Sequence, residues 1–299
     1  LCEKLLVLSL AKICNYVPGA GIWLNTQRPE WNDANNALVG NGCSMVTVYY
    51  LKRFLNFFKE IISQIKTKNI NISSEVLFWF HEVNAEITKN EHKSHTLYSD
   101  KERMNYVSGL GKIFENYREK IYSSGFSTFE KLSLNKLESF LSKICSQFNE
   151  TIFDNRKDNG LFDAYNTINI DSKNQSIDIK KLDLMLEGQV AGLSCESQKP
   201  YITISTLKSL FSSNLYRADM KSFILYPEKK ITPFLNKNII DPDHLKKSIL
   251  LRKMVDQKNT SIVEKDSDGN FRFNPKFRNI FDLINALKQL PKSEIEDIP

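Results

Sequence analysis

The chain has 299 residues, of which 41% are hydrophobic and 11% aromatic. This composition is sufficient for a sizeable apolar core and predicts a globular protein, so intrinsic disorder is not the default expectation. The formal net charge of +6 arises from 41 Lys and Arg against 35 Asp and Glu, and the basic residues are dispersed along the chain. Dispersed charge favours a solvated surface, so we do not expect nucleic acid as a partner.

The chain starts at Leu1 inside an apolar pattern with helical spacing, and we therefore expect it to be part of a longer gene product. Residues 5–11 lack the cleavage site of a secretory signal, and no run reaches the roughly 18 apolar residues that span a bilayer. The cysteines are scattered and form no C-x-x-C pair, which indicates neither a disulfide framework nor a zinc site. We predict a soluble, cytoplasmic protein that uses no metal or cofactor and has no membrane partner.

Long helices are predicted throughout the first half of the chain. In residues 43–66 the apolar side chains recur at i, i+3, i+4 and i+7, which is typical of an amphipathic helix. Similar patterns predict further helices at 73–87, 100–117 and 127–148. Long helices with short connections are typical of a helical array or toroid.

The pattern changes in the middle of the chain. Residues 155–160 are polar or glycine and predict a loop, and residues 165–170 and 176–179 alternate like short strands. Helix is predicted again from about residue 181.

The last third is predicted to combine helices with irregular segments. Helical patterns occur at 202–215 and 242–255, and the Asp-Gly pair within 266–270 predicts a hairpin turn. The sequence shows no internal repeat. The predicted fold is mainly α, an (α/α) toroid-like arrangement with small β-hairpin insertions, in which residues 1–299 form a single domain or part of one with a possible sub-boundary near 155–160.

Residues 15–42 contain more polar and special side chains than a structural connector requires. Tryptophan faces pack on sugar rings, and side-chain amides and carboxylates exchange hydrogen bonds with hydroxyl groups. A carboxyl group beside tryptophan has its charged form disfavoured, which suits a general acid. The segment therefore predicts an oligosaccharide site, with substrate-binding residues Trp23, Gln27, Arg28, Trp31, Asn32, Asn35 and Asn36 and candidate acids Glu30 and Asp33.

The motif Glu30-Trp31-Asn32-Asp33 resembles the acid-Trp-Asn-Asp motif of the (α/α)6-toroid carbohydrate enzymes related to cellobiose phosphorylase. The resemblance covers only these few residues and departs at Glu30, where that family commonly has Asp. It implies that Asp33 protonates the glycosidic oxygen, with Glu30 as a second choice, and that Trp31 and Asn32 line the sugar subsite. The alternative is that Glu30 and Asp33 cap a helix and Trp31 belongs to the core.

Glu187 is the candidate second catalytic carboxylate, because it stands alone in an apolar run at 184–193. A buried carboxylate has to be paired, protonated or facing a cavity. An inverting hydrolase requires roughly 6.5–9.5 Å between its two carboxyl groups, whereas in a phosphorylase the phosphate attacks directly. The alternatives are a structural ion pair with Arg217 or Arg53 and a base outside this sequence.

Three further residues are candidate ligand contacts. Arg217 and Asp219 are spaced to form an ion pair that orients a ligand or phosphate, with Tyr226 as a ring donor. A purely structural ion pair is the favoured interpretation, because such pairs commonly fix loops. Gly109-Leu-Gly-Lys112 lacks the spacing of a phosphate loop and is predicted to lie within a helix.

Together these features predict a fragment of a carbohydrate-active enzyme, either an inverting glycoside hydrolase or a phosphorylase that acts on oligosaccharides. Its expected partners are an oligosaccharide or glycan, inorganic phosphate in the phosphorylase case, and the remainder of its own longer chain. The alternative is a non-catalytic helical module that binds a glycan or a protein, or serves as a scaffold. Nucleic-acid binding is a third and weaker class.

Overall fold

The computed structural model describes residues 1–25, 33–90, 98–195, 200–227 and 231–291. The chain divides into two compact units, Leu1–Glu228 and Lys229–Pro299. The expected sub-boundary at 155–160 lies inside the larger unit. The division into two compact units does not test whether residues 1–299 fold as a single domain, so the single domain stays a prediction. In the described ranges, no helix is long and apolar enough to cross a membrane.

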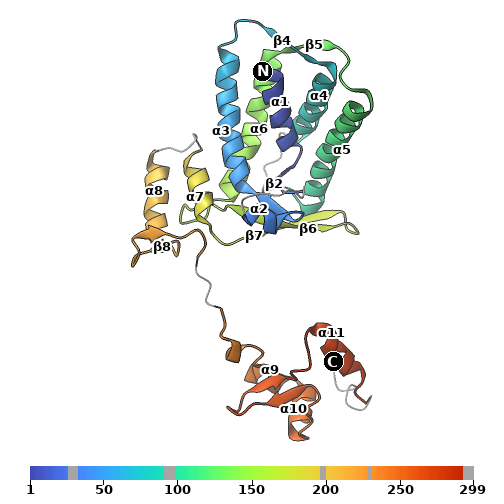
Figure 1. Ribbon diagram of the computed structural model, residues 1–299, viewed down its shortest axis with the longest axis vertical. Helices are drawn as coiled ribbons and strands as arrows, with labels where there is room; N and C mark the ends of the chain where they lie inside the picture. The colour runs from blue at the N-terminus through green and yellow to red at the C-terminus, as the bar shows by residue number, and fades with distance from the viewer. Residues whose placement is uncertain (26–32, 91–97, 196–199, 228–230, 292–299) are drawn as a thin grey trace. The chain divides into compact units, whose positions relative to one another are not determined.

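A helical bundle forms the main part of the larger unit (Figure 1). It contains α1 (Cys2–Ile13), α3 (Met45–Ser63), α4 (Ser74–Lys89), α5 (Asp100–Ser124) and α6 (Leu134–Asp154). The apolar stripe of each helix faces the others, and Phe58, Phe80, Phe140 and Phe148 are completely buried in the shared core. Burying each such side chain stabilises the fold by about 1.5–3 kcal/mol, so this core accounts for the helix packing.

Two helix–strand–helix units follow each other in the bundle. Strand β4 (Asn69–Ser73) follows α3 and continues directly into α4, and β5 (Phe129–Ser133) follows α5 and continues directly into α6. The two strands pair antiparallel, with Asn71 opposite Lys131 at the centre of the ladder. The same order of elements therefore occurs twice, although the sequence shows no repeat.

A five-stranded antiparallel sheet lies at the end of the bundle opposite the β4–β5 ribbon (Figure 1). In spatial order it contains β1 (Tyr16–Val17), β2 (Gly21–Trp23), β3 (Gly42–Ser44), β6 (Tyr165–Asp171) and β7 (Ser176–Lys181). Gly19 and Gly21 have φ values of +79° and +123° in the turn and the start of β2. Only glycine adopts such values readily, so the Pro18–Gly21 sequence determines this hairpin.

Smaller elements complete the larger unit. They are α2 (Asp33–Leu38), α7 (Leu186–Leu193), α8 (Pro200–Phe211), β8 (Tyr216–Arg217) and β9 (Ser222–Phe223).

The smaller unit packs helices against a hairpin. It contains η2 (Phe234–Asn236), α9 (Pro242–Lys247), α10 (Ile249–Asp256), β10 (Val263–Lys265), β11 (Phe271–Phe273) and α11 (Ile280–Lys288). Its buried core includes Leu250, Met254 and Ile262. The predicted hairpin turn is confirmed, since Gly269 has a φ of +89° between the paired strands β10 and β11.

The predicted mainly α, toroid-like fold is wrong, because the larger unit combines its helical bundle with a five-stranded antiparallel sheet and the β4–β5 ribbon, which makes the fold mixed α/β. Strands β1, β2 and β3 have only two or three residues each, too few to show alternation in the sequence. The predicted helix at 127–148 begins with β5, and the predicted helix at 242–255 is interrupted at Ser248, where ψ is 113°. Helical periodicity thus found the bundle helices. The strands predicted at 165–170 and 176–179 are confirmed as β6 and β7, whereas β1, β2, β3, β4 and β5 were not predicted.

Candidate functional site

Much of the segment predicted to carry the chemistry lies outside the described residues. Gln27, Arg28, Glu30, Trp31 and Asn32 belong to this part of the chain.

Four predicted residues of that segment lie at its described edges. Asp33 is the first residue of α2, but its side chain and that of Asn35 also lie outside the description. Asn36 is exposed on the same helix, and Trp23 is half-buried at the end of β2. The catalytic roles of Glu30 and Asp33 therefore stay predictions.

The two ends of the segment are joined beside Trp23. The Leu24 amide donates to the Gly42 carbonyl at 2.8 Å, and the Gly40 amide donates back to the Leu24 carbonyl at 2.6 Å. The indole Nε1 of Trp23 donates to the Gly40 carbonyl at 3.0 Å. Because its polar atom is satisfied by the backbone, Trp23 can present an apolar ring to a ligand.

Trp23 is one wall of a groove along α5, which we call the α5 groove. Its volume is about 610 Å³, which is within the usual range for small-molecule sites. The lining residues are Trp23, Met104, Val107, Ser108, Gly111, Lys112, Glu115, Asn116, Glu119, Ile170 and Ile177. They come from β2, α5 and the β6–β7 hairpin, so residues distant in sequence form the site.

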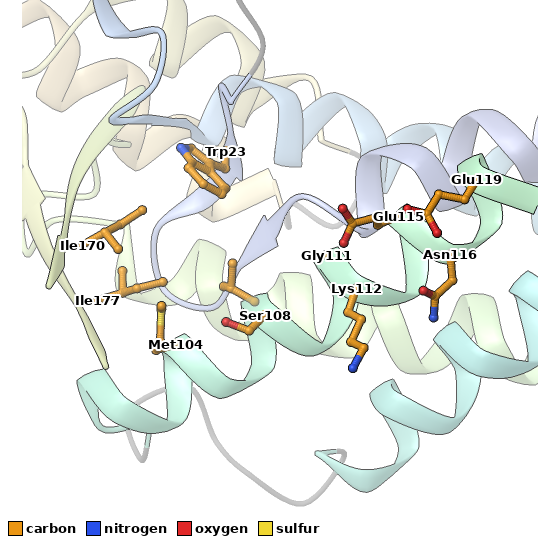
Figure 2. Close-up of a pocket in the computed structure, with 11 residues that line it drawn as sticks. Trp23, Met104, Ser108, Gly111, Lys112, Glu115, Asn116, Glu119, Ile170 and Ile177 are labelled. Atoms are coloured by element: carbon orange, nitrogen blue, oxygen red, sulfur yellow. The ribbon is translucent and has the colours of Figure 1, made fainter. Parts of the chain in front are cut away.

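The α5 groove has an apolar end and a polar end (Figure 2). Trp23, Met104 and the two isoleucines gather beside the first half of α5, and Glu115, Asn116 and Glu119 follow farther along the helix. At a rise of about 1.5 Å per residue, the α5 wall from Met104 to Glu119 extends about 22 Å. An elongated ligand with both apolar faces and hydroxyl groups fits this arrangement.

Arg103 fixes the walls of the groove relative to one another. Arg103 is buried, and its guanidinium donates to the Pro18 carbonyl at 3.1 Å and the Ile177 carbonyl at 2.7 Å. It also contacts Asp100 at 2.7 Å. One side chain on α5 therefore positions the β1–β2 turn and β7.

A second buried network holds the β1–β2 turn from the other side. The Gly19 amide donates to Thr151 Oγ1 at 3.0 Å, and Asn155 Nδ2 donates to the Gly19 carbonyl at 2.9 Å. Asn166 on β6 donates to Asn155 Oδ1 at 2.8 Å and to the Ala20 carbonyl at 2.8 Å. These buried hydrogen bonds tie the β1–β2 turn to α6 and β6, and they position the strand that carries Trp23.

Gly111 leaves open space on the α5 side of the groove. A Cβ atom at this position would meet no atom within 4 Å, although Gly111 lies in the interior of a 25-residue helix. Glycine destabilises a helix interior by about 0.5–1 kcal/mol relative to alanine. The bundle does not need this glycine for packing, and the open space beside it belongs to the groove.

The remaining predicted site residues lie outside this groove. Glu187 is half-buried in the first turn of α7, where the neighbouring Gln189 is the buried polar group and donates to the Phe162 carbonyl at 2.6 Å. Arg217 forms an ion pair with Asp219 at 2.7 Å, and Tyr226 is exposed. Their roles in substrate binding or catalysis stay predictions.

The polar residues of α5 were not predicted as site residues. Ser108, Lys112, Glu115, Asn116 and Glu119 recur at three- and four-residue spacing, which places them on one face of a helix. The glycine within this polar stripe was the signal in the sequence that could have indicated a site on α5. The opposite wall, formed by Trp23, Ile170 and Ile177, depends on tertiary contacts and could not be predicted from the sequence.

The C-terminal part of the chain resembles a known domain. Residues 231–298 match the family model described as GH149 phosphorylase insertion domain 2. This range corresponds to the smaller unit, and a search of curated proteins finds no match. The match does not involve the Glu30–Asp33 motif and does not support the cellobiose phosphorylase type in particular. It relates the chain to glycoside phosphorylases through the domain at residues 231–298.

Proposed function

We propose that this chain is an oligosaccharide-binding part of a glycoside phosphorylase-related protein, and that the α5 groove of the larger unit holds the sugar. The match of residues 231–298 to a phosphorylase insertion domain is the observation that carries this proposal. The groove supports it independently, because a tryptophan wall and a row of carboxylate, amide and hydroxyl groups are the chemistry of sugar recognition.

The expected ligand is a neutral, elongated oligosaccharide. A sugar ring stacked on Trp23 would have its C–H face against the indole, and the next rings would extend along α5 toward Glu119. Ser108 and Asn116 would exchange hydrogen bonds with the hydroxyl groups. Lys112 stands against the two carboxylates of Glu115 and Glu119 on the same wall, and this near balance of charge does not favour a strongly anionic ligand.

Binding is tested by calorimetric titration of the full chain with α- and β-linked oligosaccharides from disaccharide to hexasaccharide. Trp23→Ala is expected to weaken binding about tenfold, which corresponds to about 1.4 kcal/mol of lost stacking. Phe57→Ala is the matched control, since Phe57 is 54% exposed on α3 and does not line the groove.

A second variant distinguishes the loss of a sugar contact from a structural change in the β2–β3 connection. Trp23 also donates to the Gly40 carbonyl, so its removal affects the β2–β3 connection. Asn116→Ala changes an exposed side chain in the middle of α5 and leaves that connection intact. Equal affinity of parent, Trp23→Ala and Asn116→Ala for every sugar would refute the proposal.

The catalytic hypothesis rests on a different residue. Asp33 remains the proposed general acid, supported by the motif at residues 30–33 and by the phosphorylase relation of the C-terminal unit. Turnover of oligosaccharides with and without phosphate, compared with Asp33→Asn, tests it. Loss of turnover with retained sugar binding would assign the acid role, and equal turnover would remove Asp33 from the mechanism.

A further inference from the structure

Helix α8 is attached to the larger unit through one of its faces and lies beside α7 (Figure 1). On the attached face, Leu210 is buried in a small apolar cluster that also contains Leu215. The completely buried Thr206 donates from Oγ1 to the Gly160 carbonyl at 3.0 Å. These contacts determine which face of α8 points away from the unit.

The opposite face of α8 is an exposed apolar stripe, which we call the α8 stripe. It consists of Tyr201, Ile204, Leu207 and Phe211, whose exposed fractions are 65%, 54%, 41% and 55%. At about 100° per residue, these side chains fall within about one third of the helix circumference. The one charged residue in the sequence of α8 is Lys208, whose long side chain can extend past the stripe to water. An apolar surface therefore faces the solvent along most of the helix.

The α8 stripe has the size of an interaction site. Its two aromatic and two aliphatic side chains expose roughly 400 Å² of apolar surface. The largest apolar patch on a soluble monomer measures roughly 300–600 Å² and is often functional. Pairing two copies of the stripe removes roughly 800 Å² from water, and the exposed Pro200 and Ser212 beside it bring the total to the roughly 1,000 Å² that a stable interface requires.

The order of side chains along the stripe is nearly the same in both directions. Tyr201 and Phe211 stand at the two ends, and the aliphatic Ile204 and Leu207 stand between them. Two antiparallel copies therefore place Tyr201 against Phe211 and Ile204 against Leu207, and each pair occurs twice. The ring of Phe211 also contacts that of Phe223 at a centroid distance of 5.0 Å, which holds this end of the stripe in place.

We propose that two copies of this chain associate through the α8 stripe, with the two α8 helices antiparallel about a two-fold axis. The self-complementary order of side chains and the buried area favour a second copy over an unrelated partner. A contact between identical surfaces closes on itself, so assembly ends at the dimer. The proposal does not depend on sugar binding, because the stripe and the α5 groove share no residue.

The mass of the full chain in solution tests the proposal, measured by sedimentation over a concentration series with a reducing agent present. We expect the parent to dimerise and to dissociate on dilution. Ile204→Lys and Leu207→Glu each place a charge in both of the equivalent aliphatic pairs. Each variant is expected to weaken dimerisation about a hundredfold, about tenfold for each pair. Circular dichroism checks that both variants retain the helical content of the parent.

An equimolar mixture of the two variants tests the antiparallel pairing itself. In a mixed dimer the introduced lysine faces the introduced glutamate, and the second pair remains Leu207 against Ile204. The mixture should therefore dimerise more tightly than either variant alone. Leu8→Lys is the matched control, since Leu8 is 63% exposed on α1 outside the stripe, and it should leave dimerisation unchanged.

Three results would overturn the proposal. They are a parent that is monomeric at every concentration, a dimer that neither α8 variant weakens, and a mixture that associates no better than the separate variants. The first result would mean that the stripe is covered by a partner other than a second copy. Sugar titration of the dissociated variants should give the affinity of the parent, so a failure of this proposal is distinguishable from a failure of the α5 groove.

Discussion

Replacing Gly111 with alanine should stabilise the protein while it impairs the α5 groove. Alanine is favoured over glycine in a helix interior by about 0.5–1 kcal/mol. The new methyl group would meet no atom within 4 Å, so no steric cost reduces this gain. For a unit of this size, the expected rise in melting temperature is about 1–4 °C.

Gly109→Ala is the matched control for this prediction, because it makes the same change two residues earlier on α5. A Cβ atom there would lie 3.2 Å from both Cδ and Oε1 of Glu86. Glu86 also accepts a hydrogen bond from Asn90 at 3.2 Å, so its displacement offsets the gain in helix propensity.

Thermal unfolding followed by circular dichroism measures both variants, and sugar titration measures the effect on the groove. We expect Gly111→Ala to melt above the parent and bind sugar more weakly, and Gly109→Ala to show little or no stabilisation. A lower melting temperature for Gly111→Ala would mean that the space at Gly111 is occupied. Higher stability with unchanged sugar affinity would mean that the ligand does not use this space.

Three further predictions test the framework of the larger unit. Arg103→Met leaves several buried carbonyl oxygens without a donor and should lower the free energy of unfolding by about 3 kcal/mol, measured by urea denaturation. Replacing both Lys157 and Lys181 with methionine leaves the completely buried Asp163 carboxylate without its ion-pair partners. Urea denaturation should then show a free energy of unfolding that is lower by about 3–5 kcal/mol. Asp163→Asn should lower it less, because the two lysines that lose their partner are partly exposed to water. The hydrogen bond from the Ser127 hydroxyl lowers the pKa of Glu75 below its usual value of 4.5. The ionised Glu75 carboxylate therefore stabilises the fold above pH 4.5, and this stabilisation is lost as the pH falls through the lowered pKa. In the Glu75→Gln variant, the free energy of unfolding should decrease less steeply with falling pH than in the parent.

The bundle helices could be predicted because their apolar residues alone determine which face is buried. Phe58, Phe80 and Phe140 follow the helical period in the sequence and are all completely buried. The short strands could not be predicted in the same way, because two or three residues contain no period. Their pairing, such as Cys43 opposite Asn166, depends on contacts between segments that are far apart in the chain.

The candidate site was predictable only on one side. Trp23 was expected to bind sugar, and it lines the α5 groove. The opposite wall follows from the packing of α5 against β7, which Arg103 fixes through the Ile177 carbonyl. Local sequence does not encode that contact, so the polar stripe on α5 could be recognised as a helix face but not as part of a site.

The two lines of support for a carbohydrate function come from different parts of the chain. The phosphorylase match lies in residues 231–298, whereas the α5 groove is built from side chains between Trp23 and Ile177. The two observations are independent of each other, so together they support the proposal more strongly than either does alone. Because the match is to an insertion domain, a binding role for this chain is a more direct interpretation than catalysis, and the catalytic hypothesis depends on the predicted carboxylates Glu30, Asp33 and Glu187.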